Sequence, residues 1–167
     1  MANLMMFSFR LNSDPGLICS AYEARNNRRW SLRPDESFVP NPNVTYVEVW
    51  LGNSFLGCFT FFDTDRPQTI QVHTTLLPSA YGMASRIGDE LIEWLGGQDK
   101  YDTLQTMCLP TNRPIFRLIL SVGFKLVGQV QAEWDGHLEL FDKYEIPIPK
   151  RSEQMNKLEQ TGGIGCQ

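Results

Sequence analysis

The sequence predicts a single α/β domain, with a mixed sheet of about seven strands and helices on its faces. Apolar runs and turn residues give the order strand, helix, three strands, helix, strand, helix and two strands. Three strands in succession favour a mixed sheet over an alternating, doubly wound one. The 167 residues are 42% hydrophobic and 20% charged, which is enough for one globular core. We place this domain at residues 1–149.

The first strand and the first helix are predicted near the N-terminus. Residues Met5–Leu11 are apolar and aromatic and predict a strand. Asp14 and Pro15 suit the N-cap and first position of a helix, because the carboxylate accepts from free N–H groups and proline needs no donor there. Apolar residues at helical spacing extend this helix to about Arg28. The proline-rich segment 32–42 predicts an irregular connection.

Three strands are predicted next, over Val44–Trp50, Phe55–Phe62 and Thr69–Leu77. The first two are joined by the turn dipeptide at residues 52–53, and the next turn covers residues 63–67. Gly57 lies inside the second strand, and a glycine there indicates a bulge or a closely packed neighbour.

The second half of the domain adds two helices and three strands. Glycines mark the ends of both helices, because a helix often closes on a residue that tolerates left-handed backbone angles. The residues 135–136 (Asp-Gly) form a turn between the last two strands. The predicted elements are a helix over Met83–Leu95, a strand over Thr103–Leu109, a helix over Arg113–Val122, and strands over Phe124–Glu133 and Leu138–Ile146.

Composition excludes several classes of function. The net charge of −4 gives no basic footprint for nucleic acid or for an anionic membrane, and no apolar run is long enough to span a bilayer. The four cysteines are scattered without a Cys-x-x-Cys pair, and only two histidines are present, so we expect no metal site. Without a signal-peptide pattern at the N-terminus, we expect a reducing, cytoplasmic location.

Three stretches give the chain a family resemblance. They are Ser79–Ala84 (SAYGMA) at the change from strand to helix, the helix from Asn112 that ends in Gly123-Phe124, and the strand end Val72–Pro78 (VHTTLLP). From about residue 44 to residue 148 the sequence resembles the GCN5-related N-acetyltransferases, or GNAT superfamily. It is similar in particular to compact acetyltransferase-like proteins of tailed phages, some of them linked to head assembly.

The resemblance implies a GNAT fold, with a largely antiparallel sheet whose central strand pair splays apart. It also implies acetyl-CoA as the cofactor. Backbone N–H groups at the start of a helix, which carries partial positive charge, would hold the pyrophosphate, and Gly82 would allow close approach. The pantetheine arm would lie between the splayed strands. The candidate cofactor-binding residues are Leu76, Leu77, Ser79, Tyr81, Gly82, Met83, Ala84 and Asn112.

The sequence departs from the family pattern at positions that carry the chemistry. Ser79 stands where the family usually has arginine or glutamine, and Ile119 stands where many members have a tyrosine that protonates the thiolate. Gln71 stands where a glutamate base would be convenient. His73 is then the candidate catalytic base, since it is the one near-neutral titrating group on its strand. A structural role for His73, and a helix-capping role for Asn112, stay open as alternatives.

Two functions follow from these observations. The first is an acetyl-CoA-dependent N-acetyltransferase whose partners are CoA and a small-molecule or protein amine. The alternative is a non-catalytic phage structural or head-assembly protein, in the host cytoplasm or the virion, that acts through protein–protein contacts. Neither reading requires nucleic acid or a membrane, and homo-oligomerisation is left open. Residues 150–167 are polar and glycine-rich, so we expect a mobile tail that serves as a docking arm.

Overall fold

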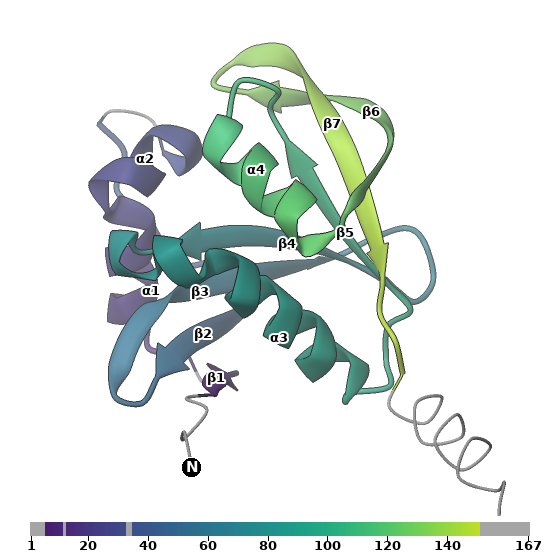
Figure 1. Ribbon diagram of the computed structural model, residues 1–167. Coiled ribbons are helices and arrows are strands. Elements are labelled where there is room, and N and C mark those ends of the chain that lie inside the picture. The colour runs from purple at the N-terminus through teal and green to yellow at the C-terminus, as the bar shows by residue number, and fades with distance from the viewer. Residues whose placement is uncertain (1–5, 12, 33–34, 151–167) are drawn as a thin grey trace, which may run out of the picture.

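Seven strands form one sheet in the order β1-β2-β3-β4-β5-β7-β6. The computed structural model describes residues 6–11, 13–32 and 35–150 (Figure 1). Only the β4–β5 pair is parallel, so the predicted mixed, largely antiparallel sheet is confirmed. The strands are β1 (Phe7–Arg10), β2 (Thr45–Leu51), β3 (Ser54–Asp63), β4 (Thr69–Leu76), β5 (Thr103–Cys108), β6 (Lys125–Trp134) and β7 (His137–Pro147).

Four α-helices and one 3-10 helix complete the described chain. They are α1 (Pro15–Glu23), α2 (Arg25–Ser31), η1 (Pro78–Met83), α3 (Ala84–Gly96) and α4 (Arg113–Val122). As predicted, the Asp14 carboxylate caps α1 by accepting from the Gly16 N–H at 2.8 Å. Helix α4 ends at Gly123, whose φ of 99° lies in the left-handed region that the sequence predicts.

The single helix predicted from Pro15 to Arg28 is wrong, because the chain breaks at Ala24. That residue has an extended backbone, with φ −54° and ψ 134°. The Asn27 side-chain amide donates to the carbonyls of Ala21 at 2.8 Å and Leu76 at 2.9 Å. The break therefore lets α2 reach the end of β4, a contact between residues distant in sequence.

The sheet buries a separate apolar cluster on each of its faces. Helices α3 and α4 lie on one face, in front of the strands in Figure 1. Alternate residues of the central strands, such as Val47, Phe59 and Val72, join their side chains in the larger cluster. On the other face, α1 packs Ile18, Ala21 and Tyr22 against Cys58 of β3. The prediction of helices on both faces is thus confirmed.

Gly57 produces both of the features expected of it. The β2–β3 register shifts between Val49 and Trp50, which places a bulge in β3 beside the glycine. Its φ is +130°, and a Cβ atom added there would lie 2.4 Å from the Thr75 carbonyl oxygen of β4. Strand β4 therefore packs against β3 at a distance that only glycine permits.

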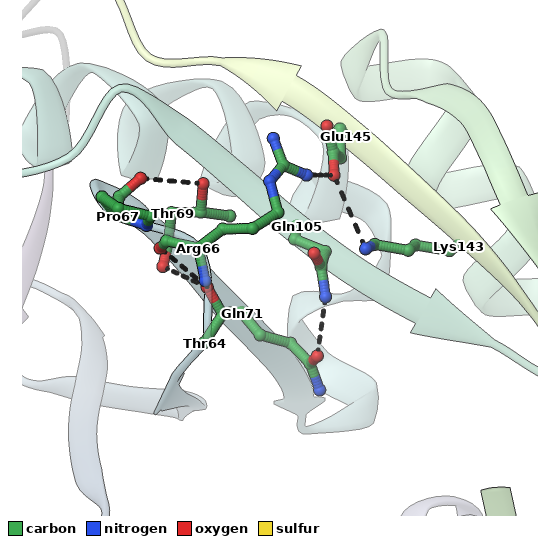
Figure 2. A network of polar contacts seen from close by, with 8 residues as sticks. All are labelled: Thr64, Arg66, Pro67, Thr69, Gln71, Gln105, Lys143 and Glu145. Atoms are coloured by element: carbon green, nitrogen blue, oxygen red, sulfur yellow. Dashed lines mark hydrogen bonds and ion pairs between the residues drawn. The ribbon is translucent and has the colours of Figure 1, made fainter. Parts of the chain in front are cut away.

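Strands β4 and β5 pair over a short seam and then part. The paired residues are Thr69–Thr103, Ile70–Leu104 and Gln71–Gln105. At the end of this seam the Gln105 amide donates to the Gln71 side-chain oxygen at 2.9 Å (Figure 2). The Thr106 hydroxyl then donates to the Val72 carbonyl at 3.0 Å, in place of a backbone bond. Beyond this point β4 and β5 continue without pairing, so the predicted splayed central pair is confirmed.

Polar contacts tie the other end of the seam. Arg66, in the turn between β3 and β4, forms an ion pair with Glu145 of β7, and Lys143 lies 3.9 Å from the same carboxylate oxygen (Figure 2). The backbone N–H of Asp102 donates to the Gln68 carbonyl at 2.8 Å. The strands are therefore held together where they begin and are free to separate where they end.

The described chain ends beside Asp102, in the segment that joins α3 to β5. The Ile148 N–H donates to the Asp102 carbonyl at 2.8 Å, and the Lys150 ammonium lies 2.7 Å from the Asp102 carboxylate. Residues 151–167, on which the docking-arm prediction falls, lie outside the described residues. Within the described chain, no helix is long and apolar enough to cross a membrane.

Candidate functional site

A cavity of about 500 Å³ lies where β4 and β5 part. Residues from both sheet faces line it, because the gap between the strands connects the two faces. The α3–α4 face contributes Ala84, Gly88, Leu91, Ile115, Leu118 and Val122, the strands contribute Thr74, Leu76, Thr106 and Cys108, and the α1 face contributes Tyr22, Phe38, Tyr46 and His73. The passage between the strands could therefore bring together two molecules that enter from opposite faces.

The apolar stripe of α4 forms one wall of this cavity. Its periodicity predicts a core-facing helix, yet Ile119 is its one buried residue, and Ile115, Leu118 and Val122 keep partial exposure. The reason is that all of them face the cavity. Because Ile119 is apolar and only 5% exposed, this position supplies no acid to the cavity.

Asn112 is the N-cap residue of α4, as the alternative predicts, and its carbonyl accepts from the Phe116 N–H at 3.0 Å, but its side chain takes no part in the cap. No hydrogen bond joins its side chain to the first turn of the helix. The residue lines the cavity and is 9% exposed, and its side-chain oxygen finds no partner among the described residues. A buried oxygen without a donor costs about 1–3 kcal/mol. A ligand that donates a hydrogen bond to this oxygen would recover that free energy.

Five residues of the SAYGMA stretch, Ser79–Met83, belong to the six-residue 3-10 helix η1, and Ala84 begins α3. Ser79, Tyr81 and Gly82 are exposed, while Met83 packs against the larger core cluster. A Cβ atom added at Gly82 would meet no atom within 4 Å, so open space surrounds this residue. The exposed residues of η1 lie next to the first turn of α3, whose first N–H, that of Ala84, donates to the Tyr81 carbonyl of η1.

The imidazole of His73 faces the cavity in its neutral form. Burial lowers its pKa to about 4. The ring stacks on Tyr22 at 5.9 Å between centroids, and neither ring nitrogen bonds to a described residue. A base that binds protons so weakly is a poor acceptor from an ammonium group. The expectation that His73 titrates near neutral pH is therefore corrected, because its burial lowers the pKa to about 4.

Burial of His73 predicts that acid destabilises the protein. The unfolded chain protonates this imidazole near its ordinary pKa of 6.5, whereas the folded chain does so near 4. Between these values the unfolded state binds more protons, so stability is complete above about pH 6.5 and is lost as the pH falls. We expect His73 to account for a loss of about 3 kcal/mol in the free energy of unfolding between about pH 7 and pH 4.

Urea denaturation at a series of pH values measures this loss. The His73→Gln variant should lose less stability on acidification than the wild type, because glutamine does not titrate. The tyrosine that stacks on His73 is present in both proteins, so it contributes equally to the pH dependence of their stability. An identical pH dependence in the two proteins would show that His73 is not the group responsible.

The other reactive side chains near the cavity stay protonated. Burial raises the pKa of Cys108 to about 11, and its thiol donates to the Leu109 carbonyl at 3.1 Å. Burial raises the pKa of Tyr22 to about 12, although its hydroxyl hydrogen-bonds to Thr60 at 2.5 Å. Neither group is a ready nucleophile at neutral pH. No cluster of His, Cys, Asp and Glu in the described ranges could hold a metal ion.

Comparison with known proteins relates this architecture to one group of enzymes. No protein-family model matches the sequence, and no curated protein matches it either. Among solved structures, a chimera of spermidine N-acetyltransferase SpeG from Vibrio cholerae and hSSAT superposes with a TM-score of 0.69 at 12% identity, over 90% of this chain and 98% of that one. The chain has the GNAT fold.

Two further structures agree with this result. The putative acetyltransferase yncA from Salmonella typhimurium, solved with its cofactor acetyl-CoA, gives a TM-score of 0.61 at 14% identity over 87% of this chain and 96% of that one. A GNAT-family acetyltransferase from Bacillus anthracis gives 0.55 at 18% identity, over 61% of this chain and 65% of that one. The finer likeness to phage proteins, and the head-assembly role, find no support in these comparisons.

Within the GNAT fold, the structure divides the predicted cofactor residues into three groups. Leu76, Ala84 and Asn112 line the cavity. Leu77 instead packs in the α1 cluster, and its N–H donates to the Leu56 carbonyl at 2.8 Å. The remaining candidates belong to η1, which leads into α3.

Sequence reasoning missed the aromatic lining of the cavity. Phe38 lies in the segment for which the sequence predicts only an irregular connection. Trp30 lies in α2, beyond the end of the single helix that the sequence predicts. Trp134 and Phe141 come from the β6–β7 hairpin. The available signal was the number of aromatic residues next to turns and irregular segments, since such residues need a partner surface to be buried.

Proposed function

We propose that the protein is an acetyl-CoA-dependent N-acetyltransferase that transfers an acetyl group to an amine. The observation that carries this proposal is the cavity between β4 and β5, which is open to residues of both sheet faces. Acetyl-CoA would supply an acyl thioester from the α3–α4 face. The amine would approach from the α1 face and meet the thioester in the gap.

Backbone and side-chain groups of this chain would hold the cofactor. Strands β4 and β5 do not pair beyond Gln71 and Gln105, so their backbone amides there can bond to the amides of a pantetheine arm. The first turn of α3 would bind the phosphates, aided by partial positive charge at the helix start. The unpartnered oxygen of Asn112 would accept a hydrogen bond from the arm.

The proton chemistry follows from the residues that are present. Ile119 offers no proton to the leaving thiolate, and His73 is too weakly basic to deprotonate an ammonium group. We assign His73 the role of accepting a hydrogen bond from an amine that is already neutral. Water in the cavity would then take up the proton, and the rate should rise with pH as the amine loses its charge.

Calorimetric titration with acetyl-CoA tests the proposal. Gly82→Val is expected to weaken binding at least about tenfold, because the added side chain occupies the open space next to the start of α3. Gly128→Val is the matched control, since that glycine also has open space around it but belongs to β6. Absence of heat and of a thermal shift at millimolar acetyl-CoA would exclude the proposed enzyme activity.

We also propose a cytoplasmic location, and self-association of the chain is a further proposal. The described cysteines, Cys19, Cys58 and Cys108, are free thiols, which suits a reducing compartment. An N-acetyltransferase of this kind needs no nucleic-acid or membrane partner.

A further inference from the structure

Aromatic rings line the part of the cavity that the amine would enter. On one side of the β4–β5 gap, Phe38 stacks on Tyr22 with ring centroids 3.8 Å apart and planes 4° from parallel. The ring of Tyr46 meets Phe38 edge-on at 6.4 Å. On the other side of the gap, Trp134 and Phe141 of the β6–β7 hairpin meet at 6.4 Å and 80°. All five residues line the cavity.

The same part of the cavity is poor in charge. Among the described residues that line it, Glu133 is the one carboxylate, and no lysine or arginine is present. Glu133 alternates along β6 with Ala132 and Trp134, so it belongs to the strand face opposite to that of Trp134. An acceptor with several positive charges would lack counterions here, and an acceptor with a carboxylate would lack a cation.

We call the part of the cavity lined by Tyr22, Phe38, Tyr46, Trp134 and Phe141 the aromatic chamber. Its polar groups lie at the end nearest the β4–β5 gap. His73 presents unbonded ring nitrogens there. Gln71 lies two residues before it on the same strand face and accepts from Gln105. An amino group can therefore hydrogen-bond at this end, while the body of its molecule meets the aromatic residues that line the cavity, Phe38 and Trp134 among them.

We propose that the acceptor is a small monoamine with a flat aromatic body and no other charged group. This inference rests on the proposed acetyltransferase function and specifies its substrate class. Flat rings stack well on the chamber walls, and an amine that carries positive charge on entry is attracted to the faces of Trp and Tyr rings. His73 then accepts a hydrogen bond from the amine and directs it towards the gap.

Steady-state kinetics with four amines test the substrate class. Tryptamine has the expected form, tryptophan adds a carboxylate to it, hexylamine removes the ring, and spermidine replaces the ring with further positive charges. We expect kcat/KM for tryptamine to exceed that for each of the others at least about tenfold. Spermidine, hexylamine or tryptophan acetylated as efficiently as tryptamine would overturn the inference.

Ring-specific variants separate stacking from simple apolar burial. Phe38→Leu and Trp134→Leu keep apolar bulk but remove a ring, so KM for tryptamine should rise at least about fivefold while KM for hexylamine changes little. Phe116→Leu is the control, since this ring lies outside the cavity and contacts Tyr144 of β7. Equal effects on both amines would contradict a stacking role.

Binding measurements distinguish failure of this inference from failure of the proposed function. If acetyl-CoA binds but tryptamine is not preferred, the substrate class is wrong and the enzyme activity stands. If acetyl-CoA does not bind, the enzyme activity is wrong. Titration of the free protein with tryptamine and with hexylamine then tests the aromatic chamber alone. If tryptamine binds no more tightly than hexylamine, the aromatic chamber is rejected as well.

Discussion

Replacement of Gly57 by alanine is expected to lower the free energy of unfolding by at least about 4 kcal/mol. Two effects act together at this position. The φ of +130° is rarely adopted by a residue with a side chain, and the added Cβ would lie 2.4 Å from the Thr75 carbonyl oxygen and 2.7 Å from the Leu76 Cα. These are backbone atoms of β4, so they cannot move aside as a flexible side chain could. Relief would require separation of β3 from β4.

Urea denaturation of the two proteins measures this loss, with Gly128→Ala as the matched control. Gly128 is also a strand glycine, but a Cβ there meets no atom within 4 Å. We expect its replacement to change stability by no more than about 1 kcal/mol. A Gly57→Ala protein as stable as the control would show that β3 and β4 can separate at little cost.

Replacement of Thr74 by phenylalanine is expected to weaken acetyl-CoA binding at least about 100-fold, or about 2.8 kcal/mol. Thr74 lies on β4 beyond the last residue that pairs with β5, and it lines the cavity. A phenylalanine ring at this position would occupy the space proposed for the pantetheine arm. Because Thr74 is only partly buried, the larger side chain can be accommodated by the cavity without disruption of the core.

The matched control is Thr74→Val, which keeps the volume and removes only the hydroxyl group. Calorimetric titration should give the valine variant nearly the affinity of the wild type. Circular dichroism and thermal unfolding would verify that both variants fold. A folded Thr74→Phe protein that binds acetyl-CoA within about threefold of the wild type would place the cofactor elsewhere.

Elements with strong local signals were predicted well from the sequence. Helix α4 has the predicted bounds, since Gly123 closes it and proline starts it. The seven strands also follow one another along the chain as predicted, because turn residues separate them clearly. The break at Ala24 could not be predicted in this way. It depends on the bond from Asn27 to the Leu76 carbonyl, and periodicity within one helix carries no information on a residue so distant in the chain.

The candidate site was predicted less completely than the fold. The sequence placed Asn112 at the start of α4 but could not tell whether its side chain would cap the helix or face a cavity. It identified His73 but assumed an ordinary pKa, since the burial that lowers the pKa depends on packing against α1. The aromatic chamber joins a connecting segment to a hairpin about a hundred residues later. Periodicity within a short window of sequence cannot predict contacts between residues so far apart.

The short seam between β4 and β5 divides the sheet into two rigid plates. One plate consists of β1 to β4 and the other of β5, β7 and β6, and each is held by antiparallel ladders, interrupted by a bulge in the β2–β3 pair and by one in the β6–β7 pair. Across the seam, the described contacts of the sheet are three residue pairs, the side-chain bonds of Gln105 and Thr106 beside them, and the bonds of Arg66 and Gln68 at the tied end. A tilt of one plate against the other, pivoting on the tied end near Arg66, breaks no ladder bond within either plate. Such a tilt would change the width of the passage in which the two substrates would meet.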